Sequence, residues 1–454
     1  MEETSKNDIE SCDRISDLPE NVIHHILSFL LIKDVIRTSF LSKRWRYIWT
    51  SVPNLEFDGL VFSPKTKFMN FVDSVILRRS GLSIQKFSLR FGGYYCDGSR
   101  IRTWILAAAT HNVRELSISS HTGEPFELPS CIFTCSSLTV LKLNSYNSTL
   151  NLPSSVRLPF LKSIQLTSVT FLEDNWNQIF RNCPMLEDVV MEDCDLGNLT
   201  VLHISSPSMQ RLTIDGLPKD STFYYPLLNH EIRISTPGLL SLKYTDCTMK
   251  NIYLENMSSL VDATIDFKFY LDKRVEICLC HVINFLKGIS HTKILTLSSS
   301  SVQFLSAASN LLRQLPTFSS LIHLKLAAAV SKDSFRVVTF LLHGSPKLEF
   351  LSIDFFLRRQ WIDEEESLEP ENAASECRVD HLRVVKIKGF GGNENELLLV
   401  KYLLENARVL ESMIIVFSKQ FSANSKLQME IRQDILMHPR GSTSSEVICE
   451  SFCL

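Results

Sequence analysis

The sequence predicts an α/β fold in which three N-terminal helices precede a β-α solenoid with a parallel concave sheet and a C-terminal capping region. Three observations lead to this fold class. An apolar pattern recurs at near-regular spacing along most of the 454 residues, residues 13–57 carry a separate helical pattern, and the last residues turn polar. A chain of this length exceeds one ordinary hydrophobic core, so either several domains or a repeat array is expected.

The apolar pattern is a six-residue frame, L-x-x-L-x-L, with apolar residues at positions 0, 3 and 5. Leu138, Leu141 and Leu143 form one clear copy. The first eight copies begin at residues 84, 113, 138, 161, 186, 209, 239 and 260. The frame weakens near residue 292 and returns at residues 321, 348, 382 and 410. This spacing is close to the roughly 20–29 residues of a leucine-rich repeat, which we expect over residues 80–356.

The frame specifies a strand and its two faces. Positions 3 and 5 point to one side of a strand because side chains alternate, and stacking of neighbouring repeats buries that side. The residues between copies return the chain over the convex side. Asn393 and Glu396 stand in capping-box spacing before an apolar stretch, which predicts a return helix as far as Leu404.

Positions 2, 4 and 6 of the frame face outward into the concavity. Their side chains mix both charges with hydroxyls and amides, which favours a protein ligand over a polyanion. For any one of these positions the simpler alternative is a solvated side chain without a role. The candidate substrate face comprises Arg211, Asp215, Lys243, Lys325 and Lys386.

Residues 13–57 predict three short helices. The first starts at Pro19 and carries an apolar stripe from Val22 to Leu30; the second starts near Asp34. The third starts at Ser42 and places Trp45, Ile48 and Trp49 on one face. So small a module cannot bury all of its large side chains, so part of its apolar surface needs an outside partner or the first repeat.

Several segments resemble a known family. Leu18-Pro19, Ile26 to Leu30, and Leu41 to Arg46 resemble an F-box, and residues 49–55 are similar to the form found in plant F-box proteins with leucine-rich repeats. Residues 128–135 are typical of the early repeats of that family, and residues 377–415 and 438–445 resemble its FBD region. Leu31 departs from the family, which usually has proline there, and this implies a looser turn.

The resemblance to the plant F-box/LRR/FBD family implies a substrate-recognition subunit of an SCF-type E3 ubiquitin ligase. The F-box would dock on a Skp-type adaptor and through it on a cullin, while the repeats would hold the protein to be ubiquitinated. The alternative for the contact residues is packing inside the F-box itself. The adaptor contacts that the resemblance implies are Leu18, Pro19, Ile26, Leu27, Leu30, Leu41 and Trp45.

Five segments follow from these patterns. We expect a disordered N-terminus over residues 1–12, the F-box over 13–57, repeats over 80–356, an acidic loop or linker over 357–376, and the FBD region with the last repeats and cap over 377–454.

Composition narrows the function further. The formal net charge of −3 gives no bulk attraction for nucleic acid or membrane, and twelve cysteines are too few for a disulfide scaffold. With no apolar N-terminal stretch of signal type, we expect the cytoplasm and/or the nucleus. Cys278, Cys280 and His281 lack the second ligand pair that structural zinc needs, so we expect no metal and no cofactor. The alternatives to a non-catalytic receptor are a scaffold without adaptor binding and an enzyme with an unrecognised site.

Overall fold

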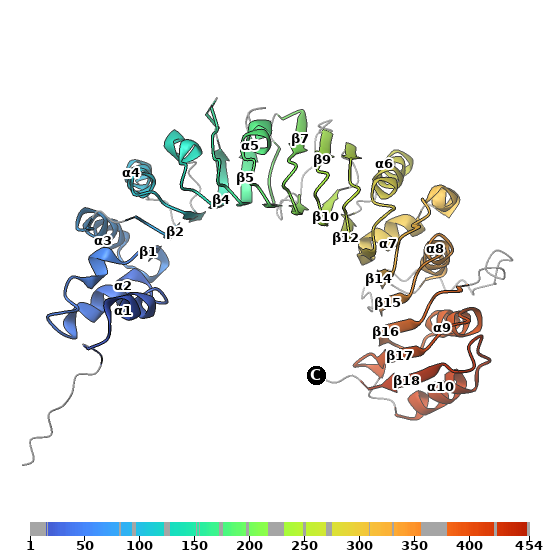
Figure 1. Ribbon diagram of the computed structural model, residues 1–454. Coiled ribbons are helices and arrows are strands. Elements are labelled where there is room, and N and C mark those ends of the chain that lie inside the picture. Colours follow the sequence, from blue (N-terminus) through green and yellow to red (C-terminus); the bar gives the residue numbers. More distant parts are fainter. Residues whose placement is uncertain are drawn as a thin grey trace, which may run out of the picture. The chain divides into compact units, whose positions relative to one another are not determined.

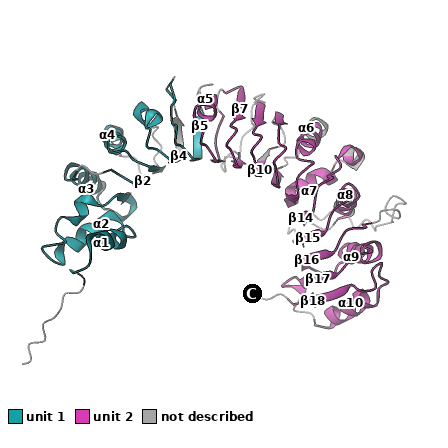
Figure 2. Ribbon diagram, in the orientation of Figure 1, with its two compact units in different colours: residues 1–175 teal, residues 176–454 magenta. Residues whose placement is uncertain are grey.

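The computed structural model describes most of the chain (Figure 1). The described residues are 15, 17–80, 83–92, 97–121, 128–150, 152–153, 155–171, 176–196, 199–216, 231–247, 251–268, 275–307, 309–328, 331–355, 379–421 and 425–451. They belong to two compact units, residues 1–175 and 176–454 (Figure 2). The expected disordered N-terminus (residues 1–12) and the expected acidic loop (residues 357–376) lie outside the described residues.

The first unit opens with the helical module. Helix α1 (Glu20–Leu27) begins directly after Pro19, and helix α2 (Ile32–Arg37) runs into the 3₁₀ turn η1 (Thr38–Phe40). The third α-helix expected from Ser42 does not form. Trp45 N–H donates to the Ser42 carbonyl over 3.2 Å, three residues back, and the helical segment is the 3₁₀ turn η2 (Ile48–Ser51). Tryptophan, tyrosine, isoleucine and threonine are weak helix formers, and they make up five of the six residues from Trp45 to Thr50.

Five parallel strands follow in the first unit. Each pairs with the next in chain order. The strands are β1 (Asn54–Asp58), β2 (Lys86–Gly92), β3 (Glu115–His121), β4 (Val140–Leu150) and β5 (Ser163–Phe171). The segments that return the chain between them include η3 (Gly59–Val61), α3 (Lys65–Leu77), α4 (Gly98–Thr110) and η4 (Ser130–Thr134). Helices α3 and α4 lie on the same side of these strands (Figure 1).

The second unit continues the same architecture with ten parallel strands. Their order in the sheet is β6-β8-β10-β12-β13-β14-β15-β16-β17-β18. The strands are β6 (Asp188–Glu192), β8 (Arg211–Asp215), β10 (Ser241–Cys247), β12 (Asp262–Lys268), β13 (Ile294–Leu297), β14 (His323–Ala328), β15 (Phe350–Phe355), β16 (Val384–Phe390), β17 (Ser412–Phe417) and β18 (Glu446–Glu450). The helical returns described here are α5 (Asn177–Asn182), α6 (Val275–Gly288), α7 (Ser299–Ser306), η6 (Ser309–Gln314), α8 (Lys332–His343), α9 (Glu394–Asn406) and α10 (Ser425–Met437).

The frame found in the sequence sets the register of this sheet. In every copy the strand starts at position 2, and positions 3 and 5 are buried. Leu324 lies opposite Leu351 and Leu326 opposite Ile353, so apolar positions align from strand to strand. The leucine-rich-repeat fold is thus confirmed. A further copy lies inside the segment assigned to the helical module: Val52, Leu55 and Phe57 occupy positions 0, 3 and 5 around strand β1.

In the middle of the second unit the returns are strands. A second parallel sheet has the order β11-β9-β7. It comprises β7 (Val201–Ser205), β9 (Glu231–Ser235) and β11 (Asn251–Glu255). The sequence analysis missed this sheet, although Leu199, Leu202 and Ile204 repeat the apolar frame between two recognised copies. Strict alternation of apolar and polar residues favours strand over helix there.

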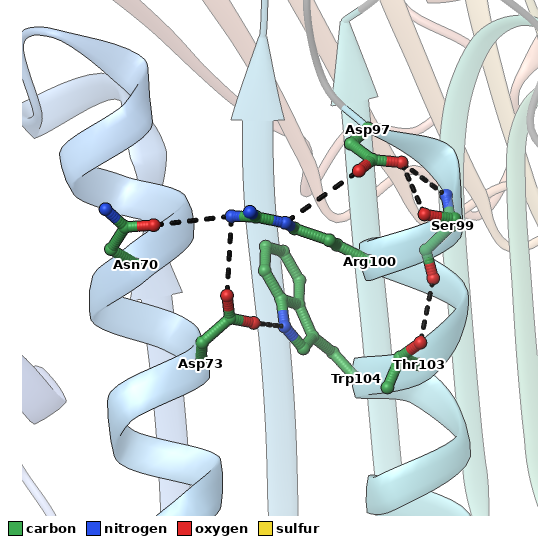
Figure 3. Close-up of polar contacts among 7 residues, drawn as sticks. All are labelled: Asn70, Asp73, Asp97, Ser99, Arg100, Thr103 and Trp104. Atoms are coloured by element: carbon green, nitrogen blue, oxygen red, sulfur yellow. Dashed lines mark hydrogen bonds and ion pairs between the residues drawn. The ribbon is translucent and has the colours of Figure 1, made fainter.

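A polar cluster joins the first two return helices (Figure 3). The indole Nε1 of Trp104 on α4 donates to Oδ1 of Asp73 on α3 over 2.7 Å. Arg100 Nη1 lies 3.4 Å from the other Asp73 oxygen and 3.4 Å from Asn70 Oδ1. Asp97, which caps α4, lies 3.8 Å from Arg100 Nε. Trp104 is buried, so Asp73 satisfies a donor that would otherwise be shielded from water.

The C-terminal segment extends the main sheet. Strand β16 pairs with β15, β17 with β16, and β18 with β17, all in parallel. The expected helix is α9, and Asn393 caps it by accepting from Glu396 N–H over 2.9 Å. The last residues form helix α10 and add strand β18 to the sheet. Glu446 and Glu450 are exposed at the two ends of β18, where charge discourages pairing with another chain.

Candidate functional site: the helical module and the open sheet face

The helical module has a small interior of its own. Its buried side chains come from α1, α2 and the segment after them. They are Ile23, Leu27, Ile32, Val35, Trp45 and Ile48. The guanidinium Nη2 of Arg44 donates to the Leu18 carbonyl over 2.7 Å, and the Ser51 hydroxyl lies 3.1 Å from His24 Nε2. These contacts join the start of the module to its end. The two segments that resemble an F-box, around Leu18 and around Arg44, are therefore packed together.

The predicted adaptor contacts divide by exposure. Pro19, Ile26, Leu30 and Leu41 are exposed, with Leu41 at 62%. Leu18 is half-buried. Leu27 and Trp45 are 1% and 3% exposed and pack inside the module. The alternative of packing inside the module therefore applies to Leu27 and Trp45. These two side chains offer little surface to a partner and instead hold the module together.

The two most exposed aromatic side chains of the module are not among the residues predicted from the sequence. Phe29 is 75% exposed in the turn after α1, and Phe40 is 89% exposed at the end of η1. Leu31 is also exposed at the start of α2. Large apolar groups left in water on so small a module mark an interaction surface. The signal available in the sequence was the excess of apolar residues over what the module can bury.

Leu31 shows that the turn keeps its geometry without the usual proline. Its φ is −62° and its ψ is 144°, and α2 begins at the next residue. Proline fixes φ near −65°, so Leu31 adopts the backbone conformation that a proline would impose. The turn therefore keeps its backbone geometry, and its expected looseness stays a prediction.

A second surface lies on the strands of the second unit. We call the side chains at frame positions 2, 4 and 6 of its main sheet the open face. Arg211 is paired with Asp188 of the neighbouring strand: its Nη2 donates to Oδ2 over 2.6 Å, and this hydrogen bond raises the pKa of Arg211. Asp215 lies 3.9 Å from Lys268 Nζ. Arg211 and Asp215 thus already have charged neighbours within the sheet.

The three lysines of the candidate substrate face differ from these two residues. Lys243, Lys325 and Lys386 all stand at frame position 4 and are exposed. Within the described part of the chain, no ion pair involves any of them. Their ammonium groups are therefore available to a partner.

Comparisons with known proteins follow the same division. The family model of the F-box domain matches residues 15–57, that of the LRR repeats of the FBD-associated F-box protein At5g56370 matches residues 101–224, and that of FBD matches residues 370–415. The chain is 30% identical to the F-box/FBD/LRR-repeat protein At5g56420 of Arabidopsis thaliana over 442 residues, covering 96% of this chain and 98% of that protein.

The chain belongs to the F-box/FBD/LRR-repeat family. Two further Arabidopsis thaliana relatives agree. The putative F-box/FBD/LRR-repeat protein At3g59240 is 29% identical over 476 residues, covering 98% of this chain and 91% of its own length. The F-box/LRR-repeat protein At4g14096 is 30% identical over 434 residues, covering 90% of this chain and 89% of its own length.

The F-box/FBD/LRR-repeat architecture gives the chain a general role. An F-box joined to leucine-rich repeats is the domain composition of a substrate adaptor, and ubiquitin ligation is the process in which F-box proteins are expected to act. Proteins of this kind are generally adaptors rather than enzymes.

The remaining candidate chemistry is sparse. Cys194 is buried, and its thiol donates to the Glu192 carbonyl of its own repeat, which is a structural role. Cys280 is exposed on α6, and the side chain of Cys278 lies outside the described residues. Among the described side chains no group of three potential metal ligands converges, and no described helix is long and apolar enough to cross a membrane.

Proposed function

We propose that this chain is the substrate-recognition subunit of an SCF-type E3 ubiquitin ligase. The F-box docks on a Skp-type adaptor and through it on a cullin, and the repeats bind the protein to be ubiquitinated. The observation that carries the docking half of this proposal is the set of large apolar side chains exposed on a segment that matches the F-box model.

The energetics support docking at these side chains. Interface hot spots are large apolar or aromatic groups that lose their water on binding, and burial contributes roughly 25 cal/mol per Å² of apolar surface. Phe29, Phe40 and Leu41 remain exposed in the free chain, so their burial is still available to a partner. The buried Trp45 and the Arg44–Leu18 hydrogen bond hold the segments that present them.

The recognition half of the proposal concerns the open face. Its exposed lysines belong to the second unit, whereas the F-box belongs to the first. Adaptor docking and substrate binding therefore use different residues and can be disabled separately. In this proposal other subunits transfer the ubiquitin, and the chain contributes binding alone.

We also propose that the protein works in the cytoplasm and/or the nucleus. Cys131, Cys135, Cys280 and Cys449 carry free thiols, which suits a reducing compartment. A fluorescent fusion expressed in plant cells tests this: signal in the secretory pathway would contradict it.

Co-purification tests the proposed function directly. The full chain is expressed together with a Skp-type adaptor and applied to a sizing column. We expect the two proteins to elute as one complex. A folded chain that elutes apart from the adaptor would support instead a repeat scaffold without adaptor binding.

A further inference from the structure

Two rows of side chains cross the open face of strands β13 to β16. Parallel register aligns frame position 2 of these strands into one row and position 4 into another. The first, which we call the apolar row, is Ile294, His323, Phe350 and Val384. The second, which we call the lysine row, is Thr296, Lys325, Ser352 and Lys386.

The apolar row contains a stacked ring pair. The rings of His323 and Phe350 lie 4.4 Å apart between centroids and 9° from parallel. All four members of the row are only half-buried. Consecutive strands of the sheet thus present partly exposed side chains of the apolar row. Apolar side chains of a partner can pack against them and be removed from water.

Beside the apolar row, the lysine row presents positive charge. Lys325 and Lys386 are exposed and take part in no ion pair among the residues that the structure describes. On the open face of β12 to β16 the acidic groups are Asp262 at position 2 of β12, opposite Ile294, and Asp266 and Asp354 at position 6 of β12 and β15. Asp354 stands opposite Lys388 in the neighbouring strand, and Asp266 accepts a hydrogen bond from the Ser298 hydroxyl. A carboxylate placed over the lysine row therefore meets ammonium groups and the hydroxyls of Thr296 and Ser352.

The spacing of the rows fits one kind of ligand. Positions 2 and 4 of a strand are about 7 Å apart, and strands about 4.8 Å apart place Lys325 and Lys386 roughly 10 Å from each other. An extended peptide that crosses the strands sends alternate side chains toward the two rows. A nucleic acid fits less well, because its continuous phosphate charge would meet Asp266 and Asp354 on the same face.

We propose that strands β13 to β16 bind an extended acidic segment of the protein substrate, with acidic side chains over the lysine row and apolar side chains over the apolar row. This inference rests on the proposed function, since it names the substrate chemistry of the open face. It narrows the candidate substrate face to its lysine part, because Arg211 and Asp215 have charged neighbours within the sheet.

Peptide selection tests the inference without knowledge of the substrate. The full chain, with the adaptor if the two co-purify, is immobilised and screened with a displayed library of random nine-residue peptides. We expect enrichment of peptides that alternate acidic and apolar residues. Fluorescence anisotropy with one enriched peptide should then show binding at least about tenfold weaker to the K325E/K386E double variant, and binding that weakens as salt rises.

Matched variants separate this site from general charge effects. Lys287→Glu together with Lys347→Glu changes the net charge equally at exposed lysines outside the strands, and K325R/K386R keeps the charge of the row. We expect both to bind the enriched peptide within about twofold of the unaltered chain. Phe350→Ala should weaken binding of the enriched peptide. The loss of affinity should be smaller for a peptide whose apolar residues are replaced by serine.

Three results would overturn the inference: a selection without an acidic–apolar consensus, equal binding by K325E/K386E, or equal loss with the K287E/K347E control. Failure of the proposed function would look different. It would leave peptide binding intact while the chain failed to co-purify with the adaptor.

Discussion

The guanidinium of Arg44 donates a 2.7 Å hydrogen bond to the backbone carbonyl of Leu18, across 26 residues of the F-box. This contact joins the Leu-Pro start of the module to the segment that buries Trp45. The same segment exposes Leu41, three residues before Arg44. One short stretch of chain therefore combines residues that hold the module together with a residue that remains available to a partner.

Trp45→Ala and Leu41→Ala should act in different ways. Removing the buried Trp45 side chain leaves a cavity and should cost about 3–5 kcal/mol of module stability, which lowers adaptor binding through unfolding. Removing the exposed Leu41 side chain should change stability by about 0.5 kcal/mol or less but weaken adaptor binding about tenfold or more. Thermal melting and adaptor titration of both variants check this. Equal melting temperatures for the two would contradict the assignment.

Asp73→Ala should destabilise the packing of α3 against α4. The change leaves the buried Trp104 Nε1 without its acceptor and also removes the ion pair with Arg100, for an expected cost of about 1–3 kcal/mol. Asp73→Asn is the matched control, because its amide oxygen can still accept from the indole. Urea unfolding should rank the unaltered chain as most stable, then D73N, then D73A. A D73A protein as stable as the unaltered chain would show that the cluster contributes nothing.

Glu396 should make the stability of the FBD region depend on pH. Its carboxylate accepts from the N–H groups of Gly391 and Gly392, both over 2.7 Å, yet burial raises its pKa. A raised folded-state pKa means that this residue stabilises most below the unfolded-state pKa, near 4.3, and that this contribution is lost as the pH rises through the folded-state pKa.

The melting temperature of the Glu396→Gln variant, compared with that of the unaltered chain at the same pH, should therefore increase as the pH rises from about 4 to 7. The exposed Glu394 of the same helix supplies the control, since Glu394→Gln should show no such trend. An E396Q protein that loses stability relative to the unaltered chain with rising pH would refute this account.

Removing the C-terminal block should expose the sheet. A chain that ends at Glu371 lacks β16 to β18, so β15 becomes an unpaired apolar edge. We expect aggregation and faster hydrogen exchange in β14 and β15. A soluble, monomeric truncated protein with unchanged exchange there would mean that residues 377–454 form an independent domain.

Charge reversal on the open face should spare adaptor binding. Replacing Lys243 and Lys325 by Glu and Arg211 by Asp alters exposed side chains of the second unit only. We expect a change of about 0.5 kcal/mol or less at each lysine and unchanged adaptor affinity. Proximity labelling should capture a different set of proteins. An unchanged set would place substrate recognition elsewhere.

The repeats were predictable because the information is local. Burial of positions 3 and 5 follows from alternation along a single strand, so Leu324 and Leu326 could be placed without knowing their neighbours. The second sheet was missed because Leu199, Leu202 and Ile204 repeat the frame only 13 residues after the copy at 186, and a leucine-rich repeat was expected to be longer. The Arg211–Asp188 pair could also have been predicted from the sequence, since both residues occupy position 2 of adjacent copies.

The F-box contacts were less predictable. Sequence identifies large apolar residues in a small module but does not say which of them fill its interior. Trp45 and Phe40 have similar character in the sequence, yet one is 3% and the other 89% exposed. That difference depends on how α1, α2 and the turns pack together.

The affinity of the purified full chain for a Skp-type adaptor tests the central claim most directly. Calorimetric titration should give one adaptor bound per chain. In L18A/P19A the binding should be lost, while hydrogen exchange through strands β14 and β15 should stay unchanged. A folded L18A/P19A protein that binds the adaptor as tightly as the unaltered chain, or an unaltered folded chain that does not bind it, would contradict the account.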